Sequence, residues 1–263
     1  GQGSGNSPMI WCFISSMLFT IHQENAIGAS YTSPDRSIFL RLFMVGFVDD
    51  TYGTVNDFAR TPPPTTTELV SMAQHDSQLW SDLLHRSGGA LELAKSKYHT
   101  VSYLFTPSGA PVLQGGQVGP DLCVTSGDAS TTMKFQHLSA YTAHKTLGCY
   151  KEPSGNQRAA AKHLLANSNR RACQLSTSPL NRKESWTFYH SVYLPSVSYS
   201  LPVGHLAPTM LHKIQAPAIR TFLPKCGYNR NMPRVVVFGP QEYGGMGFRN
   251  LAVEQGAGQI EYF

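Results

Sequence analysis

Apolar side chains cover nearly every face of the first predicted helix, which runs from about Pro8 to Gln23. Proline is tolerated in the first turn of a helix, and the serine before it, Ser7, is a suitable N-cap. A helix that is apolar on all sides is typical of the interior of a domain. We therefore expect this helix to be buried at the centre of a domain.

Two strands joined by an acidic turn are predicted next. Residues 37–48 are rich in β-branched and aromatic types, Asp49 and Asp50 follow, and residues 51–55 return to an extended pattern. The two carboxylates repel one another, so a cation such as Mg²⁺ is their expected partner. Aspartate is also a common turn residue, and an ordinary acidic turn is the competing interpretation.

A second helix is predicted after the proline run at residues 62–64. Threonines at 65–67 can cap its start, leucines recur at helical spacing along it, and Gly88-Gly89 ends it. Short strands with turn signals between them are predicted for residues 91–150, including a hairpin around Pro107-Ser108-Gly109.

The pattern becomes helical beyond Pro153. Helices are predicted at residues 157–175, 182–193 and 208–223, and an extended apolar segment is predicted at 234–238. The change of pattern near EPSGN, residues 152–156, marks a boundary between two domains. We therefore expect an α+β fold with domains at residues 1–150 and 151–263.

Composition supports a folded, globular chain. Of the 263 residues 41% are hydrophobic and only 14% are charged, which excludes a disordered charged tail. The apolar runs are shorter than the roughly 20 residues that a membrane helix needs, so no membrane partner is expected. Five widely spaced cysteines without a CxxC pair argue against secretion and indicate buried, reduced thiols.

Charge is distributed unevenly along the chain. Residues 1–94 carry four basic and nine acidic side chains, whereas the remainder carries seventeen basic and seven acidic ones. An acidic half followed by a basic half fits a chain that handles a polyanion together with a divalent metal. Ordinary variation of a protein surface is the alternative.

The basic surplus is densest between residues 145 and 183, where Glu152 is the single acid. A helical region that grips a nucleic-acid duplex is the functional interpretation, and a solvated helix face is the alternative for about half of these cations. The eight cations are Lys145, Lys151, Arg158, Lys162, Arg170, Arg171, Arg182 and Lys183.

Aromatic residues cluster just after these cations. They could stack on bases, although helical spacing more often indicates core packing. The cluster comprises Trp186, Phe188, Tyr189, Tyr193 and Tyr199.

The order of several motifs resembles that of the palm of reverse transcriptases. GQGSGNSP at residues 1–8 resembles the family's QGxxxSP motif before the palm helix. FVDD at residues 47–50 is similar to the YxDD box, with Phe47 at the tyrosine position. Leu147-Gly148 resembles the LG of the primer-grip region, and GPQEYGGMGF at residues 239–248 is similar to a segment downstream of the polymerase in non-LTR, LINE-like retroelements.

The resemblance implies roles for individual residues. Asp49 would ligate the catalytic Mg²⁺ ions, and Asp50 would support or share that role. Lys95 matches a lysine that would neutralise or protonate the pyrophosphate leaving group, although Lys97 competes for this match. Four residues would lie beside the incoming nucleotide and the template: Gly1, Gln2, Gly3 and Phe47.

The implied fold is a partial palm, made of a β-hairpin and a short antiparallel sheet with packed helices, over residues 1–150, followed by a mainly helical thumb. The implied activity is DNA synthesis from an RNA template and a DNA primer, with deoxynucleoside triphosphates as substrates. Cations from Lys145 to Lys183 would hold the RNA/DNA duplex, chiefly Lys145, Arg158, Lys162, Arg170, Arg171, Arg182 and Lys183.

The sequence departs from the family at its start. In the family, a further metal aspartate and the fingers precede the QG motif, so the chain is expected to be truncated at its N-terminus. Its two-metal site would then lack part of its ligand set, and the chain alone is expected to be inactive. A non-catalytic, nucleic-acid-binding remnant of a retroelement is the alternative.

Overall fold

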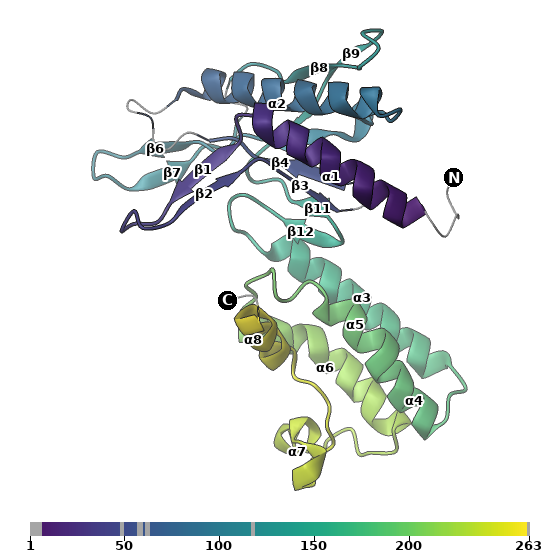
Figure 1. Ribbon diagram of the computed structural model, residues 1–263. Helices are drawn as coiled ribbons and strands as arrows, with labels where there is room; N and C mark the ends of the chain where they lie inside the picture. Colours follow the sequence, from purple (N-terminus) through teal and green to yellow (C-terminus); the bar gives the residue numbers. More distant parts are fainter. Residues whose placement is uncertain (1–6, 48–49, 57–59, 61–63, 117–118, 262–263) are drawn as a thin grey trace. The chain divides into compact units, whose positions relative to one another are not determined.

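The computed structural model of the chain is mixed α+β, about 47% helical, with small two-stranded sheets (Figure 1). It describes residues 7–47, 50–56, 60, 64–116 and 119–261. The chain divides into two compact units, unit 1 (residues 1–140) and unit 2 (residues 141–263). The division falls before the predicted boundary at residue 150, because the hairpin that follows residue 140 contacts a helix of unit 2.

Unit 1 combines two long helices with five strand pairs among its described residues. Four pairs are antiparallel (β1–β2, β3–β4, β6–β7 and β8–β9), and β5–β10 is parallel. The elements are α1 (Ser7–Asn25), β1 (Ala29–Thr32), β2 (Phe39–Leu42), β3 (Met44–Phe47), β4 (Asp50–Gly53), α2 (Thr66–Arg86), η1 (Leu93–Lys95, a 3-10 helix), β5 (Lys97–His99), β6 (Tyr103–Phe105), β7 (Pro111–Leu113), β8 (Cys123–Thr125), β9 (Thr132–Lys134) and β10 (Gln136–Leu138).

The sequence predicts α2 well because its start is encoded locally. The Thr65 side chain accepts a hydrogen bond from the Glu68 amide at 3.3 Å, and the Glu68 carboxylate accepts one from the Thr65 amide at 2.7 Å. These bonds from Thr65, assisted by Arg60, hold the pKa of the Glu68 carboxyl below its usual value. The helix ends before Gly88, whose φ of +84° suits glycine.

The expectation that α1 is buried on all sides is wrong. Its Leu18 packs with Trp80, Leu83 and Leu84 of α2 in a small cluster. The opposite face lies in solvent, with Met9 76% and Phe13 68% exposed. Apolar residues lie on all sides of α1, but among the described residues only one side packs against other elements. The other exposed apolar residues of α1 are Ile10, Met17 and Ile21.

Unit 2 is mainly helical. Its central contact is the packing of α3 against α6, and an uninterrupted helical run from α4 through η2 to α5 packs beside them (Figure 1). The elements are β11 (His144–Thr146), β12 (Cys149–Lys151), α3 (Arg158–Thr177), α4 (Arg182–Phe188), η2 (Tyr189–Tyr193, a π-helix), α5 (Leu194–Ser198), α6 (Pro208–Lys225), α7 (Arg234–Phe238), η3 (Gln241–Tyr243) and α8 (Leu251–Glu261).

The predicted extended segment at residues 234–238 is wrong, because these residues form the short helix α7. The amides of Val236 and Val237 turn back to donate to the Pro233 carbonyl at 3.0 and 3.1 Å. Their own carbonyls accept from Met246 and Phe248, which belong to the glycine-rich segment. These long-range bonds override the β-propensity of the valine run.

Two expectations on composition can be compared with the structure. All five cysteines are free thiols, but only Cys226 is buried, so their predicted burial is wrong for the rest. Within the described ranges, no helix combines the length and the apolar character that crossing a membrane requires.

Candidate functional site

A hairpin forms at the predicted acidic turn, but the predicted strand at residues 37–48 is divided into β2, which pairs with β1, and β3, and Asp50 is the first residue of β4. β3 and β4 pair antiparallel, with Met44 opposite Gly53 and Phe47 opposite Asp50. The side chains of Phe47 and Asp50 are both exposed. The paired strands therefore extend to the residues on either side of positions 48–49. Of the predicted site residues, Asp49, Gly1, Gln2 and Gly3 lie outside the described residues.

A close contact with α1 holds this hairpin in place. A Cβ on Gly46 would lie 2.3 Å from the ring of Phe19, so only glycine lets β3 approach the helix this closely. The Phe19 ring in turn stacks on Trp80 of α2, with ring centroids 5.0 Å apart. The strand that leads to Phe47 is thereby fixed against both helices of unit 1.

The carboxylate of Asp50 is a suitable kind of ligand for Mg²⁺. Magnesium is commonly bound through one or two carboxylates together with substrate phosphates. Within the part of the chain that the structure describes, no group of three His, Cys, Asp or Glu side chains could enclose a metal ion. The described residues are thus compatible with a metal held jointly with a substrate, and they do not form a closed metal site.

Lys95 is an exposed residue at the end of η1, and Lys97 is an exposed residue at the start of β5. η1 lies against β9, whereas β4, which begins with Asp50, lies against α2. No ion pair joins either lysine to Asp50. The geometry does not favour one lysine over the other for the predicted role.

The basic residues of unit 2 lie mainly on the outside of α3, α4 and the β11–β12 hairpin. Lys145, Arg158, Lys162 and Arg170 are exposed, as are Arg182 and Lys183 at the start of α4. No ion pair among the described residues involves any of these six. Arg158 and Lys162 are one helical turn apart on the same exposed face.

Arg171 diverges from this face. It is half-buried, its Nη1 donates to the Gln174 side chain at 2.9 Å, and its Nε is buried without a hydrogen-bond partner. We therefore exclude Arg171 from the basic face, which we define as Lys145, Arg158, Lys162, Arg170, Arg182 and Lys183.

A chain of contacts within the basic face links the hairpin to α3. The Lys145 ammonium lies 5.9 Å from the centre of the Tyr150 ring, and that ring lies 5.1 Å from the His163 imidazole. Asn167 donates to Nε2 of His163 and accepts from Nη2 of Arg170, both at 3.1 Å. Burial lowers the pKa of His163, and the charges of Lys145 and Arg170 lower it further.

The turn that follows β11, the strand of Lys145, has a strained backbone. The residues between β11 and β12, Leu147 and Gly148, have φ of +50° and +82°. Two positive φ angles in a two-residue loop are typical of a type I′ turn, which suits Gly148 but not a leucine. These are the two residues that resemble the LG of a primer grip.

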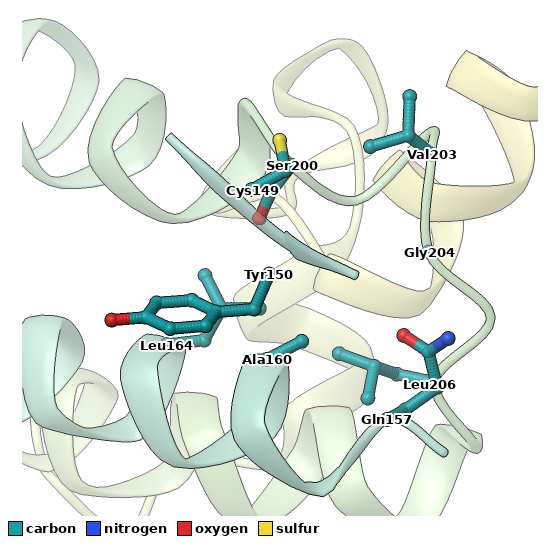
Figure 2. Close-up of a pocket in the computed structure, with 9 residues that line it drawn as sticks. All are labelled: Cys149, Tyr150, Gln157, Ala160, Leu164, Ser200, Val203, Gly204 and Leu206. Carbon is teal, nitrogen blue, oxygen red and sulfur yellow. The ribbon is translucent and has the colours of Figure 1, made fainter. Parts of the chain in front are cut away.

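A small pocket lies beneath Tyr150 (Figure 2). Figure 2 shows the Tyr150 ring beside Leu164 of α3, with its hydroxyl pointing away from Gln157 and Gly204. The enclosed space is about 10 Å³, which is roughly what a single water molecule requires. The pocket is too small for a substrate, so the surface around Tyr150 is the functional candidate.

The aromatic cluster belongs to the core of unit 2. Tyr189 and Tyr193 are 0% exposed, stack on one another at 5.5 Å and contact Phe222 of α6. Burial raises the pKa of Tyr193 to about 12. Core packing, rather than base stacking, is therefore their role, while Tyr199 remains exposed.

The glycine-rich segment at residues 239–248 is also structural. A Cβ on Gly245 would lie 2.2 Å from the backbone of Gly239, so the chain crosses itself closely there. The turn places Met246 and Phe248 in the core of unit 2.

Sequence reasoning missed Asp76, a carboxylate that is only 6% exposed. Its two oxygens accept from the amides of Ile27 and Gly28, each at 2.8 Å, and so join the end of α1 to α2. His22 lies beside it, with Nε2 3.2 Å from the Asp76 carbonyl oxygen, and burial lowers the pKa of His22. The signal in the sequence that could have identified Asp76 is its position on the apolar face of an amphipathic helix.

Comparison of the chain with protein-family models, with curated proteins and with solved structures gives no match.

Proposed function

We propose that this chain is part of a reverse transcriptase, in which unit 1 carries the acidic hairpin of the polymerase palm and unit 2 holds the RNA/DNA duplex as a thumb. The observation that carries the proposal is the hairpin β3–β4, whose strands pair up to Phe47 and Asp50 and which is fixed to α1 through Gly46. The order along the chain of the apolar helix α1, the acidic hairpin and the amphipathic helix α2 supports the proposal, with the pair β1–β2 between α1 and the hairpin.

The reaction in this proposal is nucleotidyl transfer. The 3′-hydroxyl oxygen of a primer bonds to the α-phosphorus of a deoxynucleoside triphosphate, and pyrophosphate leaves. Two Mg²⁺ ions would stabilise the charge on the attacking and leaving oxygens. Asp49 and Asp50 would hold these ions, and Lys95 would face the leaving group.

Fe²⁺ in place of Mg²⁺ tests the metal site directly, because peroxide then cleaves the backbone next to the bound metal. With an RNA/DNA hybrid and a deoxynucleoside triphosphate present, we expect cleavage close to residues 47–51. Asp49→Asn or Asp50→Asn should abolish it, whereas Asp35→Asn, in the exposed turn after β1, should not. Cleavage that is absent, or that persists in both hairpin variants, would overturn the assignment of a metal to this hairpin.

The basic face provides the second test. Binding of a labelled RNA/DNA hybrid should weaken with salt, with a log–log slope of roughly −0.9 for each phosphate contacted. Arg158→Gln with Lys162→Gln should make the slope less steep by about 2, and Lys213→Gln on α6 should leave it nearly unchanged. Binding that does not depend on salt would exclude this face as the duplex site.

A non-catalytic nucleic-acid-binding protein is the second candidate function. It is favoured by the exposed cations of the basic face, none of which forms an ion pair among the described residues. Primer extension on poly(rA)/oligo(dT) with Mg²⁺ separates the two. Synthesis that depends on Asp49 supports the polymerase, and duplex binding with neither synthesis nor metal-directed cleavage supports the binding protein.

A further inference from the structure

Three cationic or titratable side chains of unit 2 converge around Tyr150 and Asn167. Lys145 lies on β11, whereas His163 and Arg170 lie on α3. Lys145 and His163 flank the Tyr150 ring, and Asn167 bridges His163 to Arg170. The resemblance to reverse transcriptases assigns no role to His163, Tyr150 or Asn167.

We propose that Lys145, His163 and Arg170 form a phosphate-binding site on the basic face, and that this site holds the nucleic-acid backbone more tightly when His163 is protonated. The proposal rests on the proposed duplex binding by unit 2. To that proposal it adds the residues that contact a phosphate group and the protonation state of His163 that regulates this contact.

The surroundings of this site are positive. Neither α3 nor the hairpin of β11 and β12 contains an acidic residue. Glu152, the first carboxylate after the hairpin, accepts hydrogen bonds from Ser154 and Asn156. An anion placed here therefore meets cations without competing for them with a neighbouring carboxylate.

The elements packed against α3 supply no compensating charge to His163. Besides burial, only Lys145 and Arg170 shift the pKa of His163, and both lower it. The other titratable side chains on the packed elements are His144, Cys149, Tyr150 and Lys151 on the hairpin, Tyr189, His190 and Tyr193 on η2, and His212, Lys213, Arg220 and Lys225 on α6, while α5 has none.

Asn167 couples the protonation of His163 to Arg170. In the observed arrangement Nε2 of His163 accepts from the Asn167 amide nitrogen, so the imidazole is neutral. A proton on Nε2 turns this acceptor into a donor, and Asn167 must then present its carbonyl oxygen to the imidazole. That rotation removes the acceptor from Nη2 of Arg170 and frees this donor for a ligand.

Phosphate is the ligand that these groups fit best. The planar guanidinium of Arg170 can donate two parallel hydrogen bonds to phosphate oxygens, and Lys145 adds a compact point charge. A bound phosphate would offset the repulsion that Lys145 and Arg170 exert on a protonated His163. By linkage, a ligand that favours the protonated imidazole binds more tightly as pH falls through the pKa of His163 in the complex.

The experiment measures the affinity of the full chain for a labelled RNA/DNA hybrid between pH 5 and 8 at constant ionic strength. We expect affinity to rise as the pH falls, by up to about tenfold per unit for one coupled proton. His163→Gln places a hydrogen-bonding amide at this position in place of the titrating imidazole, and should reduce the change to less than twofold. His212→Gln, at an exposed histidine of α6, is the matched control and should retain the wild-type profile.

NMR of labelled histidines, with the His163 signal assigned by its loss in His163→Gln, gives a second measurement. Adding the hybrid should raise the pKa of His163. Inorganic phosphate alone should raise it too if the site takes an isolated phosphate, whereas a shift with the hybrid alone identifies the backbone as the ligand. Arg170→Gln should raise the pKa of His163 in the free chain and weaken binding of the hybrid, with the fold checked by circular dichroism.

The outcomes distinguish the two proposals. If the chain binds no hybrid at any pH, duplex binding by unit 2 fails and the phosphate site fails with it. If binding is salt-dependent but its pH profile is unchanged in His163→Gln, duplex binding stands and the role of His163 is overturned. A His163 pKa that neither the hybrid nor phosphate raises also overturns that role.

Discussion

The two units bury their apolar side chains to very different extents. Among the described residues, unit 2 has one contiguous core of twenty buried residues, whereas the two buried apolar clusters of unit 1 contain five and four residues. Unit 1 also exposes apolar side chains along α1, β2 and the β6–β7 hairpin. Because the free energy of unfolding grows with the buried apolar area, unit 2 should be more stable than unit 1.

This difference matters for the two candidate sites. The basic face lies on helices with a continuous core behind them. The acidic hairpin depends instead on a few contacts, chiefly Gly46 with Phe19 and Phe19 with Trp80. The fold should therefore hold the basic face rigidly and leave the acidic hairpin more sensitive to substitutions at the residues that support it. Hydrogen exchange by mass spectrometry can follow each unit separately.

The largest effect is expected from Phe222→Ala in unit 2. Phe222 is fully buried against Tyr189 and Tyr193, so truncation should lower the free energy of unfolding of unit 2 by about 3–5 kcal/mol. Exchange should accelerate throughout α3 and α6 and remain unchanged in α2. A loss below about 1 kcal/mol would contradict the contrast between the two cores.

Asp76→Ala should be the most damaging polar substitution in unit 1. It leaves the amides of Ile27 and Gly28 without their acceptor, which should cost about 2–4 kcal/mol. Asp76→Asn keeps one acceptor oxygen and should cost about half as much. Asp82→Ala, which removes a carboxylate that accepts a hydrogen bond from the Gln78 side chain, is the control and should cost less than about 1 kcal/mol. Equal costs for both alanine variants would show that Asp76 does not anchor α1.

Leu147→Asn should stabilise the hairpin of unit 2. A leucine at positive φ is strained by about 1–2 kcal/mol, and asparagine tolerates this region better. Slower exchange of residues 144–151, equivalent to about 0.5–1 kcal/mol, is expected. Thr146→Asn, at the end of β11, should bring no gain. Faster exchange in Leu147→Asn would mean that contacts of the leucine side chain outweigh the strain.

Phe13→Ala should have the smallest effect. Phe13 is 68% exposed on α1, so its loss should change stability by no more than about 0.5 kcal/mol. Binding of a hydrophobic dye to unit 1 should nevertheless decrease. Leu18→Ala, on the buried face of the same helix, is the control and should cost about 2–4 kcal/mol. A comparable cost at both positions would show that the outer face of α1 is packed in solution.

Local signals in the sequence account for the elements that were predicted correctly. The Thr65–Glu68 capping box sets the start of α2, and β-branched and aromatic residues around an acidic turn predict the hairpin β3–β4. The burial of α1 could not be predicted, because an all-apolar surface does not specify which side meets a partner. The helix α7 was missed because bonds from Met246 and Phe248 decide its conformation.

The candidate site was predictable only as a list of charges. The eight cations between Lys145 and Lys183 are visible in the sequence, and their helical spacing shows that some must diverge around the helix, but it does not identify Arg171 as the one that turns inward. The contact of Tyr150 with His163 joins a hairpin to a helix, and short-range patterns do not encode such pairs. The assignment of catalytic roles to Asp49, Asp50 and Lys95 stays a prediction.

The π-helical turn η2 has a consequence for insertions and deletions. Buried residues recur every four positions from α4 to just beyond α5: Ser185, Tyr189, Tyr193, Val197 and Leu201. In a regular α-helix, side chains four residues apart point in directions that differ by about 40°. Five residues at this spacing would therefore not all face the same side of the helix. The wider turn at η2 offsets part of this rotation. Deleting one residue there would rotate everything that follows by about 100° and turn Val197 away from α3 and α8, the helices that α5 contacts.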